Sequence, residues 1–274
     1  MCNLTTNELH NRKLDGCYFL IMCFKTKINI RKDDEILRKE VYLFFACNLQ
    51  GVRKFIDIVY ADEFTKTSDW YNFLLTIKKR GTDVVLYANI PDNKHLKDAL
   101  SLAFKDIKIF LSCYGAIDTI FKYYTPNYST NVFKIIRKIY LSETIDDYYD
   151  SIKLFKNEFS SSQFIIDILE KDLDIVKSYY STSLLLRKHI ISFYFYREIR
   201  KKLYSFSHSK AYFENSDEFL ELLIPKIYII ESKCYCPKKE WINVINEIYI
   251  PNKDLLKCYF WYIVSFKNGG ILYE

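Results

Sequence analysis

The residue types that most often carry chemistry are few in this chain and widely spaced. The four histidines stand at 10, 95, 189 and 208, and none has a second ligand at metal-binding spacing. Cys234 and Cys236 form a close pair, but no second pair or nearby histidine completes a zinc site. The sequence also has no glycine-rich phosphate loop and no nucleophile elbow. These patterns do not indicate a zinc, P-loop or hydrolase site.

Composition indicates a folded, moderately basic protein. The chain has 274 residues, of which 50% are hydrophobic and 27% are charged, so it can bury a sizeable core. Its net charge of +6 suits a polyanionic partner without requiring one. No N-terminal segment has the pattern of a secretory signal, and no apolar run reaches the roughly 18 residues that span a bilayer. We therefore expect a protein that is neither secreted nor bound to a membrane.

The first half of the sequence predicts a mixed sheet. Apolar runs at 17–25, 39–47 and 53–60 predict three strands with short connections, which favours an antiparallel meander. Two more strands are predicted at 84–88 and 107–111, each after a helical stripe. Strands that alternate with helices usually pair in parallel. We therefore predict an α/β fold with an RNase H-like sheet, in which three antiparallel strands precede two parallel ones.

The helices are predicted from apolar periodicity and from their end signals. The stripe from Trp70 to Ile77 predicts a helix with Ser68 as N-cap and Gly81 just past its end. Thr144 and Asp147 form a capping box for a later helix. From 116 onward the pattern is almost wholly helical, with stripes through 163–180, 184–204 and 216–248.

Several segments resemble the Mutator family of DDE transposases. Leu14 to Tyr18 resembles the family's first strand, where an Asp opens onto an apolar run. Trp70 to Gly81 resembles its Phe/Trp-x-x-x-Leu-x-x-Leu-Lys-x-Arg-Gly helix. The family's helical insertion resembles residues 134–159. Its closing basic helix with the following loop resembles residues 197–220, and its terminal tryptophan helix resembles residues 239–246. The likeness covers 10–248 and begins at the first strand, so we expect no N-terminal DNA-binding region here.

This resemblance implies a domain organisation. It divides the chain into an RNase H-like core at 10–124, a helical insertion at 125–185, a returning catalytic-type helix with further helices at 186–248, and a tail of unassigned role at 249–274.

The resemblance also implies a chemistry of DNA cleavage and strand transfer. Two metal ions about 4 Å apart activate the attacking oxygen and stabilise the leaving one. Mg²⁺ or Mn²⁺ prefers hard oxygen ligands, so several carboxylates must converge from separate elements. The family supplies an Asp from its first strand, an Asp after its fourth strand and a Glu from the helix after the insertion. On this chain the resemblance places these catalytic and metal-binding roles at Asp15, Asp92 and Glu198.

Three positions depart from the family pattern. The second Asp should fall near 89–90, so Asp92 fits only with an insertion in the loop, and otherwise it caps the next helix. Arg197 takes the family's Glu position, and Glu198 follows one residue later, a rotation of about 100° on a helix. The family's His after the fifth strand is absent, so Cys113 nearby is expected to be a buried thiol. We therefore expect impaired catalysis.

Basic residues cluster on and beyond the last catalytic-type helix, a region that lies along the DNA in the family. Lysine and arginine there would contact phosphates without reading sequence, and the alternative is a solvated helix face. The residues are Arg187, Lys188, Arg197, Arg200, Lys201, Lys202 and Lys210.

The sequence leaves three functions open. The first is a DDE transposase, active or recently inactivated, and the second is a non-catalytic DNA-binding or interaction protein derived from one. The third is an unrelated helical interaction protein. We favour a transposase-family protein with impaired chemistry, located inside the cell with its DNA partner, and we include a homo-oligomer among the expected assemblies.

Overall fold

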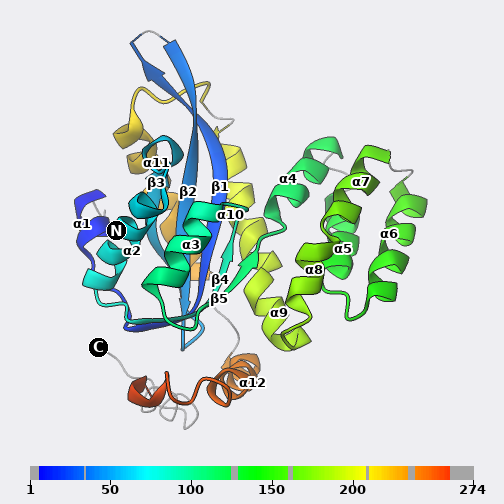
Figure 1. Cartoon of the computed structure of the whole chain (residues 1–274). Helices are drawn as coiled ribbons and strands as arrows, with labels where there is room; N and C mark the ends of the chain where they lie inside the picture. Colours follow the sequence, from blue (N-terminus) through cyan, green and yellow to red (C-terminus); the bar gives the residue numbers. More distant parts are fainter. Residues whose placement is uncertain are drawn as a thin grey trace. The chain divides into compact units, whose positions relative to one another are not determined.

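The computed structural model describes residues 6–33, 35–124, 129–159, 163–207, 210–233 and 238–259 (Figure 1). The chain divides into two compact units. The first combines Met1–Ile109 with Tyr194–Glu274, and the second is Phe110–Phe193. In the described ranges, no helix has the length and apolar character needed to cross a membrane.

The first unit is built on a five-stranded mixed sheet. Its strands are β1 (Cys17–Lys32), β2 (Glu35–Asn48), β3 (Arg53–Tyr60), β4 (Val84–Ile90) and β5 (Lys108–Leu111), in the order β3-β2-β1-β4-β5. β2 is antiparallel to both β1 and β3, whereas β1 and β4 run parallel. The predicted α/β class is confirmed, and the strand order is the one expected of an RNase H-like sheet.

Two helices, α2 (Thr67–Lys79) and α3 (Lys94–Ala103), pack against one face of the sheet in a shared core. The predicted stripe from Trp70 to Ile77 is confirmed, because its apolar residues are buried. Ser68 is not the N-cap: α2 begins at Thr67, and the Asp69 carboxylate accepts from the backbone N–H of Lys66 at 2.8 Å. Gly81 has a φ of 116°, which suits glycine and explains why the helix ends there.

Arg80, the arginine of the family-like helix motif, ties the N-terminal segment to β3. Its guanidinium pairs with the buried Asp57 at 2.9 Å and donates to the carbonyls of Leu9 at 2.9 Å and Ile56 at 3.2 Å. His10 of α1 (Thr6–Asn11) also contacts Asp57, at 2.9 Å, and this hydrogen bond raises the pKa of His10. The motif therefore has a structural role, because without Arg80 the buried Asp57 carboxylate would keep only its contact with His10.

The opposite face of the sheet is covered by residues from the end of the chain. The helices there are α10 (Phe193–Ser207), α11 (Ser216–Lys233) and α12 (Lys238–Tyr249). Trp241 of α12 is fully buried and donates from Nε1 to the Leu49 carbonyl at 2.8 Å. Its ring lies against Gly51, where an added Cβ would come within 2.8 Å of the indole. A short helix, η3 (Lys257–Tyr259), follows, and the Tyr259 hydroxyl donates to the Gly16 carbonyl at 3.0 Å.

β1 and β2 continue as a two-stranded ribbon beyond the rest of the sheet (Figure 1). The pairing of β1 with β4 reaches Met22, and the pairing of β2 with β3 starts at Val41. The ribbon is longer than the apolar runs predict, because polar residues alternate with β-branched ones along 25–30. That alternation is typical of a strand with one solvent-facing side.

The second unit is helical and was predicted as such. Its helices are α4 (Tyr114–Tyr123), α5 (Ser129–Tyr140), α6 (Ile145–Phe159), α7 (Gln163–Lys171), α8 (Leu173–Tyr179) and α9 (Leu184–Ile191). The Thr144–Asp147 capping box is confirmed by reciprocal bonds of 3.2 and 3.1 Å. Two predicted helices are each divided: 163–180 breaks at Asp172, and 184–204 breaks at Ser192, which has a φ of 49°.

The core of the second unit contains a polar group among its aromatic rings. The Tyr140 hydroxyl donates to the Asp172 carboxylate, and burial raises the pKa of Asp172. Cys113 is buried in this unit, and burial raises the pKa of its thiol well above the usual range. Cys113 is therefore the buried thiol that the sequence predicts.

Candidate active site

The parallel register of β1 and β4 determines which side chains meet at the carboxyl end of these strands. Cys17 is the partner of Val84, and Met22 is the partner of Asn89. In open α/β sheets, ligands usually bind in the crevice beyond the carboxyl ends of parallel strands. The candidate site is therefore the end at which β4 stops, and Asp92 lies just past it and is exposed.

Asp15 precedes β1 and lies at the other end of the strand. Its carboxylate accepts from Asn48 Nδ2 at 2.9 Å and pairs with Lys54 at 3.3 Å. Its backbone carbonyl accepts from the Thr82 hydroxyl at 3.1 Å. Asp15 therefore connects the start of β1 to the β2–β3 turn, which is a structural arrangement.

The structure does not bring Asp15 and Asp92 together. The register sets Cys17 and Met22 five positions apart along β1, or about 16 Å at 3.3 Å per residue. Asp15 lies before this stretch, and Asp92 lies beyond the level of Met22. Two catalytic metal ions share ligands only when they are about 4 Å apart. These two carboxylates therefore do not fit a shared two-metal site.

Aromatic rings pack together where β1 continues past Met22, its last partner on β4. Phe24, two residues after Met22, has its ring centroid 6.0 Å from that of Phe195 and 6.1 Å from that of Tyr196, both on α10. Phe45 of β2 lies 5.6 Å from Phe24 and 5.2 Å from Phe195. All four side chains are buried. We call these four residues the aromatic cluster.

The third predicted site residue lies on the same helix but not on its buried face. Phe195, Tyr196 and Ile199 form the buried face of α10. Glu198 is partly exposed, and its carboxylate lies 3.8 Å from Arg197 Nε. Arg197 is about half exposed, with its guanidinium 5.3 Å from the Tyr194 ring centre. Arg197 therefore points away from the sheet, and aromatic side chains occupy the sheet-facing positions.

The sequence suggests that Asp92 either binds a metal ion or caps the helix that follows it. The structure shows no contact of Asp92 that supports either role. Asn93 is the N-cap of α3, and its side chain accepts from the Leu96 N–H at 3.0 Å. Within the described ranges, no three His, Cys, Asp or Glu side chains come close enough to hold a metal ion.

Three of the predicted DNA-binding residues share the outward face of α10. Arg200 and Lys201 follow Arg197 by three and four positions, so each neighbours Arg197 on the side of the helix away from Phe195 and Ile199. We call these three residues the basic strip. Arg197 and Lys201 are exposed, and Arg200 is partly exposed.

The remaining predicted basic residues have other environments. The structure corrects the expectation that Arg187 contacts DNA phosphates. Arg187 is buried, and its guanidinium donates to the carbonyls of Ser142 and Thr182, so it is not available to phosphate. Lys188, also in the second unit, is exposed. In the first unit, Lys210 is exposed and pairs with Glu218.

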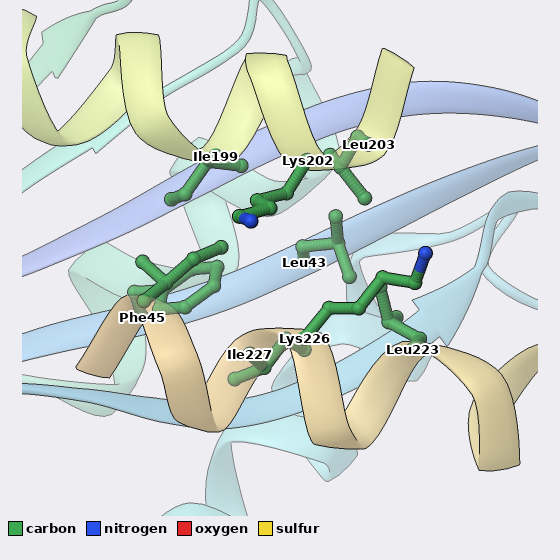
Figure 2. A pocket seen from close by; sticks show the side chains of 9 residues that line it. Leu43, Phe45, Ile199, Lys202, Leu203, Leu223, Lys226 and Ile227 are labelled. Carbon is green, nitrogen blue, oxygen red and sulfur yellow. The ribbon is translucent and has the colours of Figure 1, made fainter. Parts of the chain in front are cut away.

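Lys202 borders a small apolar gap between α10 and α11 (Figure 2). Leu43, Phe45 and Leu223 are among the apolar side chains that line it, and Lys226 comes from the facing helix. The gap measures about 10 Å³, which is room for one water molecule. It is therefore a gap in packing rather than a ligand site.

Comparison with known families agrees with this architecture. The Mutator family of transposases matches residues 3–227, which is most of the chain. A search of curated proteins finds no match. A mixed α/β sheet of this order, followed by a helical unit and a returning helix, defines the chain as transposase-like. The chain belongs to the Mutator transposase family.

The aromatic cluster is the feature that sequence reasoning missed. A signal for it was present, since the apolar run from Cys17 to Phe24 contains no acidic residue. The carboxylate nearest to this run, Asp15, opens the strand as the family pattern predicts, but the register of β1 with β4 places it at the opposite end from Asp92.

The aromatic cluster predicts a stability effect that a catalytic residue would not show. Phe195→Ala should lower the free energy of unfolding by about 3–5 kcal/mol, because it opens a cavity among buried rings. The matched control is Tyr194→Ala on the exposed face of α10, with an expected loss of no more than about 1 kcal/mol. Urea unfolding of both variants measures the difference, and equal losses would contradict the packing described above.

Proposed function

We propose that this protein is a DNA-binding member of the Mutator transposase family that has lost metal-dependent strand transfer. It keeps the sheet, the helical unit and the returning helix of the family, and it uses the outer face of α10 to contact DNA. An intracellular location with its DNA partner is part of this proposal.

The single observation that carries the proposal is the aromatic cluster at the carboxyl end of β4. A DDE site needs carboxylates from the first strand, the fourth strand and the returning helix at one point. Here the nearest positions are Met22 and Phe24 on β1, Asn89 on β4 and Phe195 on α10, and none carries a charge. Buried rings exclude the water and the oxygen ligands that Mg²⁺ keeps around itself.

The remaining carboxylates support the loss of the metal site. Asp92 is exposed beyond β4, Glu198 lies beside Arg197, and Asp15 is paired with Lys54. A guanidinium next to one candidate ligand and an ammonium next to another disfavour a divalent cation at either place. These residues therefore do not fit Mg²⁺ or Mn²⁺, and we assign no reaction step to a bound metal.

The basic strip supports binding to DNA phosphates. Three cations on one helical face present a row of charge without a defined pocket, and such contacts bind the backbone of the duplex without reading its sequence. Because α10 packs on the sheet through its opposite face, the strip is held on a rigid support.

We expect no metal-dependent cleavage of DNA. Supercoiled plasmid incubated with the full chain and Mg²⁺ or Mn²⁺ should stay uncut, as it does when the metal is removed with EDTA. Gel electrophoresis of the plasmid measures this. Nicking that requires the metal and disappears in both Asp92→Ala and Glu198→Ala would show a working site and refute the loss of chemistry.

DNA affinity should depend on the basic strip. A triple variant in which Arg197, Arg200 and Lys201 are changed to Ala should bind a short DNA duplex more weakly. The slope of log Kd against log salt concentration should fall by about 2.7, at about 0.9 for each lost phosphate contact. The matched control removes the same charge elsewhere, by changing the exposed Lys94, Lys97 and Lys105 to Ala. Fluorescence anisotropy over a salt series measures both. Equal losses would mean that net charge, not the strip, determines binding.

A further inference from the structure

The ribbon formed by β1 and β2 has one covered edge and one open edge. On the β1 side, Phe213 forms a parallel bridge with Ile30. On the β2 side, the pairing with β3 ends where Val41 meets Tyr60. Within the described ranges, no backbone hydrogen bond from another part of the chain reaches 36–38 on this side.

The hydrogen bonds on the covered side show which backbone groups face the open side. Arg31 N–H donates to the Phe213 carbonyl at 2.8 Å, and Phe213 N–H donates to the Asn29 carbonyl at 2.9 Å. The N–H and C=O groups of Asn29 and Arg31 therefore point away from β2. Their partners across the ribbon are Arg38 and Ile36. In an antiparallel pair these partners also point their backbone groups outward, so Ile36 and Arg38 present theirs to the open edge.

The open edge carries exposed apolar side chains. Ile36 is 54% exposed and Leu37 is 38% exposed, and they project to opposite faces of the ribbon. An open edge strand with exposed apolar residues is a template for pairing with another strand. Natural proteins usually cover or charge such edges. Among the described parts of the ribbon, another segment covers the β1 side alone, and the β2 side carries Glu35, Arg38 and Lys39 beside its apolar residues.

We propose that this edge is a dimer interface, in which residues 35–39 pair antiparallel with the same segment of a second copy around a two-fold axis at Leu37. An isologous contact of this kind closes after two copies and cannot extend into a fibre. The proposal goes beyond the proposed function and does not depend on it, because it rests on the backbone and side chains of the ribbon.

The charge pattern selects this register. The outward-facing backbone N–H and C=O groups of the two copies can bond to each other only when the two-fold axis passes through residue 36, 37 or 38. An axis at Arg38 places two arginines opposite each other, which is unfavourable. An axis at Ile36 places Glu35 opposite Leu37. An axis at Leu37 instead pairs Glu35 of each copy with Lys39 of the other and joins the two Leu37 side chains.

The length of the interface follows from the fold. Beyond 39 the edge is soon occupied, because Tyr60 already pairs with Val41. Lys39 also pairs with Asp62 of its own chain at 2.8 Å, which holds the ammonium near the edge. A five-residue strand pair is small for a stable interface, so association should be reversible and dependent on concentration.

Sedimentation velocity of the full chain over a concentration series tests the proposal. We expect a monomer–dimer equilibrium that is lost in Ile36→Pro, because proline removes an outward N–H that β1 does not use. The control is Leu102→Lys, which removes a 68% exposed apolar side chain on α3 and should leave the dimer intact. Circular dichroism confirms that each variant is folded. A wild-type chain that stays monomeric throughout, or an Ile36→Pro variant that still dimerises fully, would overturn the proposal.

Cross-linking locates the axis. Residues opposite each other in a non-hydrogen-bonded antiparallel pair have Cα atoms about 4.5 Å apart, within the range of a disulfide. Leu37→Cys should therefore give a covalent dimer on mild oxidation, well above the yield of the wild type with its native cysteines. Ile36→Cys is the matched control, because it faces Arg38 of the other copy. Equal yields of covalent dimer from the two variants would place the two-fold axis elsewhere. If Ile36→Pro weakened DNA binding and left dimerisation unchanged, the ribbon would be a DNA contact instead of a dimer interface.

Discussion

The parallel pairing of β1 with β4 is the constraint on which the rest of the molecule depends. Its register aligns Met22 with Asn89 and leaves Asp15 before the start of β1. The residues that β1 brings to the carboxyl end of β4 must therefore come from the middle of that strand. β1 supplies Phe24 there, and its ring packs against Phe195 of α10. We propose that this packing replaces the charge of a metal site.

The returning helix α10 serves two purposes on its two faces. Its inner face packs Phe195 and Ile199 onto the sheet, and its outer face presents Arg197 and Lys201. The proposed loss of carboxylates from the inner face need not disturb the outer face, because the two faces touch different partners. We propose that this transposase scaffold has lost strand transfer while it keeps a rigid row of cations for DNA, and aromatic packing stabilises the sheet beneath α10.

Sequence patterns predicted the sheet, the first helices and the family, because these depend on local periodicity and end signals. The buried stripe of α2 and the positive φ of Gly81 are examples. The site was harder to predict, since the placement of Asp15 depends on strand register, which is a non-local property. The burial of Arg187 and the length of the β1–β2 ribbon were missed for related reasons: a buried cation needs carbonyls that are distant in sequence, and a half-exposed strand has a weak apolar signal.

The most direct test of the proposed loss of the metal site is calorimetric titration of Mn²⁺ into the intact chain, compared with Asp15→Ala and Asp92→Ala. The aromatic cluster predicts no saturable binding to the wild type and identical titrations for all three proteins. One or two equivalents of Mn²⁺ bound by the wild type and lost in either variant would contradict this account, because they would require the carboxylates to converge despite the register of β1 and β4.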